Sequence, residues 1–232
     1  MTSETSCCVL LFGCKENHYM EVYFMYTARY IRLMIGLVLY AIGIVLMINA
    51  DLGLAPWEAF HIGLSQVTGQ SFGMVSIIVG FMIIAITYQL KESIGIGTIA
   101  SNFFVGLLVD LLFFIDLIPM ANNTFNGVVM ILSGMVAIAV ASYFYIGSAF
   151  GTGPRDGLMV ALTREYNKPI GLVRGSIELS VLVLGYLLGA KIGIGTILIG
   201  FGIGPVVQVV FKLLKFEVKD IEHTAFLQKR AT

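Results

Sequence analysis

Six titratable residues stand out in this chain because they lie within or beside long apolar stretches, where a charge is costly. An ionised side chain at the centre of a bilayer costs about 2.5–3.5 kcal/mol on insertion scales, so such residues tend to pair, to bind a solute or to relay a proton. The candidate solute-binding residues are Glu58, His61, Arg155, Asp156, Arg174 and Glu178. Without the histidine their formal charge is 2 − 3 = −1, which favours a zwitterion or a cation over an anion.

Arg174 and Glu178 are four residues apart, so they lie on one face if this stretch is helical. We expect an ion pair that faces the protein interior, because two uncompensated charges would oppose insertion of the helix. One role for this pair is to hold the helix against its neighbours. The other role is to meet a substrate or a proton, and the spacing alone leaves both open.

The stretch from Gly151 to Gly157 reads Gly-Thr-Gly-Pro-Arg-Asp-Gly and is the most distinctive local motif. Pro154 suits the first turn of a helix, which places Arg155 and Asp156 beside the positive end of the helix dipole. A helix start with an arginine beside it can hold an anion. Alternatively, Asp156 pairs with Arg155 and the motif is a capped turn. The related stretch 98 residues earlier has Trp57 in place of Arg155, which favours an asymmetric site unless Trp57 is an interfacial anchor.

His61 lies one helical turn after Glu58. It could couple transport to a proton, or it could be an ordinary polar residue of the helix. Asp110, deep in an apolar stretch, is a weaker candidate for a solute pathway. The sequence has no G-x-S-x-G or H-E-x-x-H motif and no cysteine–histidine cluster. We therefore expect no catalytic residue, no metal site, no cofactor and no enzymatic activity.

The amino-acid composition indicates the class of protein that holds these residues. Of the 232 residues, 58% are apolar and 12% are charged, whereas a soluble domain has about 45–50% and about 25%. The net charge is zero, which suggests no nucleic acid partner. These values predict an integral membrane protein whose surroundings are the lipid bilayer.

Six apolar stretches approach the length of about 20 residues that a membrane-spanning helix needs. They cover roughly residues 32–49, 72–88, 94–115, 127–150, 170–189 and 192–211. Two shorter segments, 56–68 and 154–166, begin with proline and are too short and too polar to cross easily. We expect both to be short helices that re-enter the membrane or line a cavity.

The chain contains an internal repeat with an offset of 98 residues. Ile94-Gly-Ile-Gly-Thr-Ile99 recurs unchanged as Ile192-Gly-Ile-Gly-Thr-Ile197, and residues 33–110 match residues 131–208 at 20 of 78 positions without a gap. Each copy has one long span, a break at Gly-x-x-Pro, a short segment and two more spans. Because three crossings are an odd number, the two copies should have opposite orientations in the membrane.

The predicted fold is therefore an all-α membrane protein with six transmembrane helices in two inverted three-helix repeats, each with a short broken or re-entrant helix. Lys and Arg gather on one side if both termini are cytoplasmic, with Lys191 as the exception. The expected boundaries are a tail over 1–28 (unstructured or a mis-assigned start), repeat 1 over 29–118, a linker over 119–126, repeat 2 over 127–216 and a cytoplasmic tail over 217–232.

The motifs Gly53-x-x-Pro56-Trp57, Gly95-Ile-Gly-Thr98, Gly153-Pro-Arg-Asp-Gly-Leu-Met159, Arg174-x-x-x-Glu178 and Gly193-x-Gly-Thr196 form a combined pattern. Over about residues 30–212 this pattern resembles the YczE/YyaS/YitT family of bacterial multi-pass membrane proteins. The resemblance implies a location in the bacterial cytoplasmic membrane. It implies little about activity, and it carries over no catalytic residue.

Inverted repeats with broken helices are common in secondary transporters, whose sites lie where the repeats meet. We therefore expect a small-solute transporter or permease with a charged site between the repeats, acting on a small polar or zwitterionic solute. The alternative is a non-transporting membrane partner that stabilises or regulates another protein. An intramembrane enzyme is less favoured, since no nucleophile is recognisable. The sequence does not indicate the oligomeric state.

The inverted arrangement predicts the membrane sides of two loops. Tags at positions 120 and 160 should be accessible from opposite faces of the membrane, because an odd number of crossings separates them. Labelling with a membrane-impermeant reagent in oriented vesicles measures this. Labelling of both positions from the same face would contradict the arrangement.

Overall fold

The computed structural model describes residues 27, 29–92, 94–148, 150, 153–215 and 225–227. Within them, six helices are long and apolar enough to cross a membrane. They are Arg29–Asn49, α3 (Phe72–Gln89), α4 (Ile96–Ile115), α5 (Thr124–Gly147), α7 (Ile170–Leu187) and α8 (Ile194–Leu213). The prediction of an all-helical protein with six such helices is confirmed. Apart from Thr27 and the short strand β2 (Ala225–Leu227), the two predicted tails lie outside the described residues.

The two short helices have the predicted bounds, α2 (Pro56–Thr68) and α6 (Pro154–Tyr166). Each begins with proline, whose missing N–H would be unsatisfied there in any residue. Each ends at a residue in the left-handed conformation, Gly69 in α2 and Asn167 in α6. At 13 residues each spans about 20 Å, too short for the hydrocarbon core of about 30 Å.

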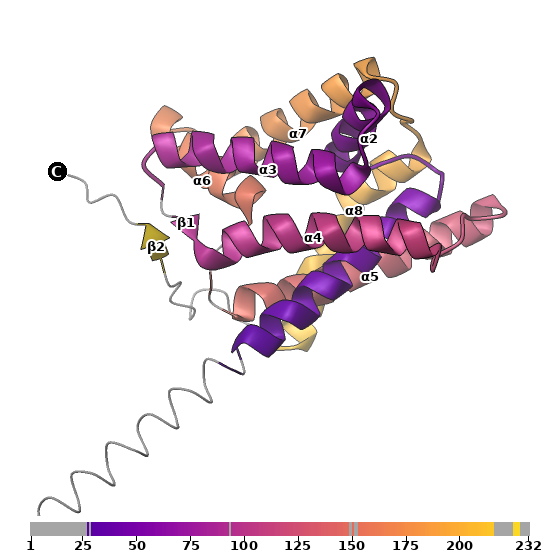
Figure 1. Ribbon diagram of the computed structural model, residues 1–232, viewed down its shortest axis with the longest axis horizontal. Coiled ribbons are helices and arrows are strands. Elements are labelled where there is room, and N and C mark those ends of the chain that lie inside the picture. The colour runs from indigo at the N-terminus through magenta and orange to yellow at the C-terminus, as the bar shows by residue number, and fades with distance from the viewer. Residues whose placement is uncertain are drawn as a thin grey trace, which may run out of the picture.

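Each short helix packs against a long helix from the other half of the chain. α2 packs on α7, and α6 packs on α3, so the two halves exchange their short segments. In Figure 1, α2 and α6 lie towards opposite ends of α3. The backbone repeats this exchange, because the Gly97 N–H donates to the Phe150 carbonyl and the Gly195 N–H donates to the Leu52 carbonyl, both at 2.8 Å. The two donors are 98 residues apart, and so are the two acceptors.

The first long helix crosses α5 at small residues. A Cβ atom at Gly43 would lie 2.9 Å from the Gly134 carbonyl oxygen, and one at Gly134 would lie 2.9 Å from the Gly43 carbonyl oxygen. Glycine is needed at both positions because the backbones touch, as is common between helices in membranes. The fully buried Val45, Ile131 and Met135 belong to the apolar core at this crossing.

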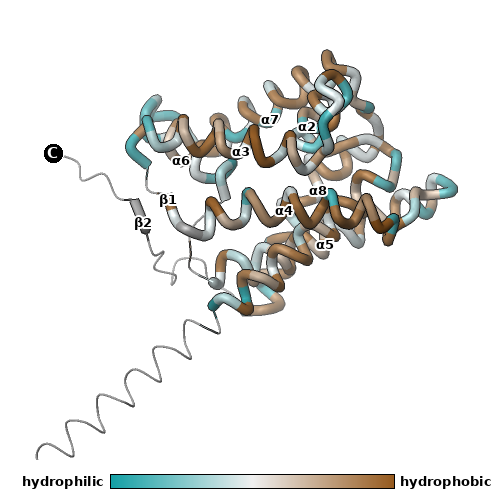
Figure 2. The backbone as a smooth tube through the Cα atoms, in the orientation of Figure 1, coloured by the Kyte–Doolittle hydropathy of each residue, from teal (hydrophilic) through white to brown (hydrophobic). Residues whose placement is uncertain are grey.

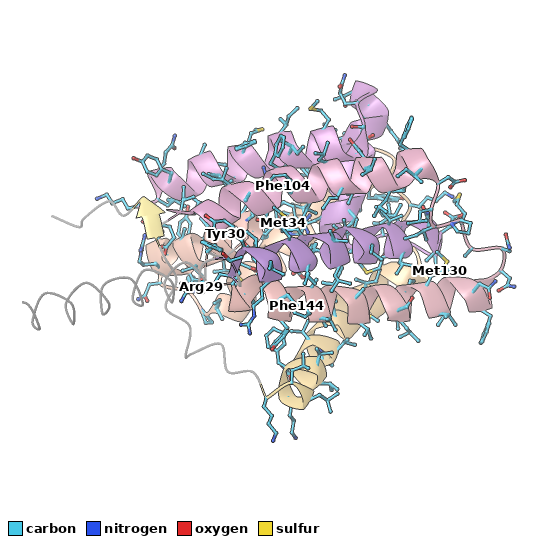
Figure 3. All side chains as sticks on the ribbon, turned by 60° about the horizontal axis from the view of Figure 1, so that its bottom comes forward. Arg29, Tyr30, Met34, Phe104, Met130 and Phe144 are labelled. Atoms are coloured by element: carbon cyan, nitrogen blue, oxygen red, sulfur yellow. The ribbon has the colours of Figure 1, made fainter. Side chains whose placement is uncertain are left out.

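The two helix pairs that close each half are packed differently. α3 packs closely on α4, whereas α7 stands apart from α8. We call the line of contact between two neighbouring helices their seam. A Cβ atom at Gly106 would lie 2.8 Å from the Gly73 carbonyl oxygen, so these glycines allow α3 and α4 to pack closely along their seam. A Cβ atom at their counterparts, Gly171 and Gly204, would meet no described atom of a neighbouring element within 4 Å. Figure 3 shows the C-terminal end of α8, in yellow, projecting away from the other helices. One seam is therefore closed and the equivalent seam is open.

The outer surface fits a lipid environment. Figure 2 shows hydrophobic residues along the middle of the helices and hydrophilic residues gathered towards their ends. Tyr30, Met34 and Phe104, which are labelled in Figure 3, are exposed at the surface. An apolar surface of this extent is not stable in water, so the fold supports the assignment as a multi-pass membrane protein.

The unequal seams predict unequal effects of one substitution. Gly106→Leu should lower the free energy of unfolding by about 1–3 kcal/mol, because the new side chain meets the backbone of α3. Gly204→Leu should leave it unchanged or raise it slightly, since the position is open and glycine is a poor helix former. Thermal unfolding of both variants in detergent measures this. Equal losses of stability would contradict the difference between the seams.

Candidate functional site

A cavity of about 460 Å³ lies between the two halves of the chain. Its lining comes from the first long helix, both short helices and all the other long helices. The six residues proposed from the sequence all line it: Glu58, His61, Arg155, Asp156, Arg174 and Glu178. Residues that are up to 120 positions apart in the chain thus meet around one chamber.

Glu58 and Arg155 form an ion pair between the first turns of α2 and α6. Their Oε1 and Nη1 atoms are 3.3 Å apart, and the side chains are 6% and 30% exposed. The sequence allows Asp156 as the internal partner of Arg155, but the structure does not form this pair. Arg155 pairs with Glu58 from the other half of the chain, whereas among the described residues Asp156 makes no hydrogen bond or ion pair.

Trp57 lies under the same arginine. The guanidinium carbon of Arg155 is 4.9 Å from the centroid of the Trp57 ring, a cation–π arrangement that is stronger away from water. The indole is buried in an apolar cluster with Val75 and Val79, so an interfacial anchor is the wrong interpretation. Trp57 and Arg155 are 98 residues apart, which means that corresponding positions of the repeat contact each other here.

Arg174 and Glu178 form the ion pair that their spacing predicts, with 2.9 Å between Nε and Oε1 on α7. The pair is less buried than expected, because the side chains are 55% and 33% exposed and α7 stands apart from α8. Both residues line the cavity wall. The Asp156 carboxylate faces the same cavity, where desolvation raises its pKa and the positive charges of Arg174 and Arg155 lower it again.

His61 is a buried imidazole in the cavity wall, on the short helix α2. It is 2% exposed, and its ring packs edge-on against Phe72 with 5.6 Å between centroids. Neither ring nitrogen has a hydrogen-bond partner within the part of the chain that the structure describes. Burial lowers the pKa of His61 well below its usual value, and the positive charge of Arg155 lowers it further. His61 is therefore neutral near pH 7 and adds no charge to the cavity.

The structure adds lining residues that sequence reasoning missed, namely Tyr40, Ser101, Asn102 and Tyr145. Asn102 donates from Nδ2 to the Ile77 carbonyl at 3.0 Å, and the hydroxyl groups of Ser101 and Tyr145 are 3.3 Å apart. Single polar residues in long apolar helices carry no spacing signal. Only the packing of the helices places them in the cavity.

Asp110 and the second Ile-Gly-Ile-Gly-Thr run both have structural roles. Asp110 accepts hydrogen bonds from the Gly73 N–H at 2.7 Å and from the Ser71 hydroxyl, so it fixes the start of α3 and lies outside the cavity lining. In the second Ile-Gly-Ile-Gly-Thr run, Thr196 accepts from the Gly193 N–H at 3.3 Å. Its glycines contact the backbone of Leu52, as helix packing requires.

A metal centre has no basis in the described ranges, where no group of three His, Cys, Asp or Glu residues could hold an ion. The lining instead offers two internal ion pairs, one free carboxylate and a neutral imidazole. With walls of apolar and aromatic residues, this combination can bind a small charged organic molecule.

Comparisons with known proteins give relatives without an assigned activity. Residues 27–212 match a family described as a family of unknown function, DUF6198. An uncharacterized protein of Haemophilus influenzae is 32% identical over 187 residues, which are 79% of this chain and 85% of the relative. The uncharacterized membrane protein YczE of Bacillus subtilis is 35% identical over 166 residues, with 70% and 76% covered. The uncharacterized protein YyaS of the same organism is 27% identical over 173 residues, with 73% and 86% covered. No solved structure matches.

The pair between α2 and α6 predicts a stability difference. Arg155→Met should lower the free energy of unfolding by about 1–3 kcal/mol, because it leaves the Glu58 carboxylate buried without a partner. Adding Glu58→Gln should restore much of the loss. Thermal unfolding in detergent measures both variants.

Lys191→Met is the matched control for this prediction. It breaks an exposed ion pair with Asp51, so it should cost less than about 1 kcal/mol. A loss from Arg155→Met no larger than that of the control would contradict a structural role for the Glu58–Arg155 pair.

Proposed function

This chain belongs to the DUF6198 family, and we propose that it is a small-solute transporter or permease with a charged site between its two halves. The resemblance stated from the sequence motifs is confirmed by the relatives YczE and YyaS. Their names assign no activity, so the proposal rests on the geometry of this chain. Its place is the bacterial cytoplasmic membrane, with both termini in the cytoplasm, as the distribution of Lys and Arg favours.

The observation that carries the proposal is the charged cavity where the halves meet. A solid bundle with every charge paired would favour a non-transporting partner of another membrane protein. The chain instead has a chamber of about 460 Å³, and on its wall the carboxylate of Asp156 has no ion-pair partner among the described residues. Cavities with charged groups inside a membrane fold are typical of solute and ion pathways.

We infer that the two halves are inverted repeats related by a two-fold axis through the site. The exchange of α2 and α6 between the halves supports this, as do the two equivalent backbone hydrogen bonds. Close contacts between helices follow the same rule. Gly185 contacts Ala59, and their counterparts Thr87 and Gly157 also contact each other. The contact between Trp57 and Arg155 lies where such an axis would pass.

The unequal seams support alternating access as the transport mechanism. In the present conformation the α3–α4 seam is closed by Gly73, Gly106 and the fit of Asn102 onto Gly80. The counterparts of Asn102 and Gly80 are Gly200 and Glu178, and a Cβ atom at Gly200 would meet no described atom of a neighbouring element within 4 Å. In the second conformation, α8 closes on α7 with Glu178 over Gly200, and α3 separates from α4. The cavity would then open to the other side of the membrane.

The experiment that tests the function is solute uptake into liposomes that contain the purified protein. A panel of labelled small cations and zwitterions should include one that accumulates above the level of empty liposomes. Arg155→Ala and Glu178→Gln should each lower its uptake at least tenfold, because each removes one half of an ion pair in the cavity wall. Glu165→Gln is the control, since it removes a charge from α6 outside the cavity lining.

Two results would contradict the proposal at different levels. Uptake that is unchanged in both cavity variants would remove the site assignment. Uptake no greater than in empty liposomes for the whole panel would contradict transport of this class of solute.

A further inference from the structure

We propose that the cavity binds a monovalent organic cation, a protonated amine with an apolar body, and that Asp156 is its counter-charge. This inference deepens the proposed function by naming the class of solute. It rests on the proposed function only for the claim that the bound amine is transported. Binding of the amine can be measured separately from transport.

The net charge of the cavity lining favours a cation as the ligand. Both arginines are already paired, Arg155 with Glu58 and Arg174 with Glu178. Within the described lining, Asp156 then remains as the carboxylate without an ion pair. His61 is neutral, so it does not offset that charge. The lining as a whole therefore carries 2 − 3 = −1.

A charge of this kind selects its ligand by electrostatics. Asp156 is exposed at the cavity, so a ligand can reach its carboxylate, and an opposite charge stabilises a carboxylate inside a membrane fold. A ligand of charge +1 brings the site to neutrality, whereas a zwitterion leaves the net charge at −1 and an anion raises it to −2. The structure thus narrows the sequence expectation, which left zwitterions and cations open, towards cations.

The size and walls of the cavity point to an organic cation. A volume of about 460 Å³ is within the range of sites for small organic molecules and far exceeds that of a bare metal ion. Tyr40 and Tyr145 line it together with aliphatic residues such as Ile44, Val105 and Ile199. Aromatic faces attract cations, and aliphatic walls favour an apolar body.

His61 gives a second, independent indication of a ligand. It lines the wall, is 2% exposed, and has two ring nitrogens without a partner among the described residues. Buried polar groups in folded proteins are nearly always hydrogen-bonded, so an imidazole beside a cavity with no partner among the described residues has hydrogen-bonding capacity that a ligand can use. The N–H groups of a protonated amine match the acceptor of a neutral imidazole.

The test compares ligands that differ mainly in charge. Phenylpropylamine, phenylpropanol and phenylpropionate share one hydrocarbon frame and carry +1, 0 and −1 at pH 7. Phenylalanine adds the zwitterion, and NaCl adds an inorganic cation. Each is titrated against the purified full chain in detergent, by isothermal calorimetry and by the shift in unfolding temperature. The amine should bind at least tenfold more tightly than the alcohol, the zwitterion and the anion.

Variants assign the binding to Asp156. Asp156→Asn should weaken binding of the amine at least tenfold, Asp156→Glu should retain it, and Glu165→Gln on the same helix should leave it unchanged. Equal or tighter binding of the alcohol, the zwitterion or the anion would overturn the proposal. So would amine binding that survives Asp156→Asn, or stabilisation by NaCl equal to that by the amine. The ligand series on the unaltered chain decides the question even if Asp156→Asn fails to fold.

Measuring both binding and uptake into liposomes distinguishes a failure of this inference from a failure of the proposed function. If the amine binds through Asp156 and no amine enters protein-containing liposomes, the site stands and the transport function is wrong. If zwitterions are transported and amines neither bind nor enter, the function stands and the inference on the solute is wrong.

Discussion

The structure depends on one constraint, which is that a charge inside a membrane protein needs a partner. Glu58 and Arg155 satisfy it together, and they do so from two short helices that belong to different halves of the chain. The pair thereby joins the halves at their centre, above the Trp57 ring. Arg174 and Glu178 satisfy the same constraint within one helix. Asp156 has no ion-pair partner among the described residues, and its carboxylate gives the described lining a net negative charge.

The repeat explains how the partners reach each other. Corresponding residues of the two copies hold equivalent backbone contacts, so the short helices cross over and bring their first turns together. At the centre the copies differ, with Trp57 against Arg155 and Glu58 against Asp156. The divergence makes a contact that two identical copies could not make, because two arginines would repel and two tryptophans would leave Glu58 unpaired.

Much of this fold follows from the sequence. The proline at the start of α2 and of α6 and the lengths of the apolar stretches predict the helices to within a few residues at their ends. The spacing of Arg174 and Glu178 predicts their pair. The partner of Arg155, the burial of Trp57 and the place of Tyr40 depend on how helices from distant parts of the chain pack. The open α7–α8 seam carries no sequence signal at all, since Gly171 and Gly204 match the glycines that close the other seam.

The central claim is that the two halves can exchange the open and closed seams around the charged cavity. Spin-label distances measure it directly, with one pair at Ile78 and Phe103 across the α3–α4 seam and the equivalent pair at Ser176 and Phe201 across the α7–α8 seam. The native cysteines Cys7, Cys8 and Cys14 are first replaced. In liposomes each seam should show a short and a long distance, and conditions that favour the short distance at one seam should favour the long distance at the other. A single distance at each seam, with α7 always apart from α8, would contradict the account.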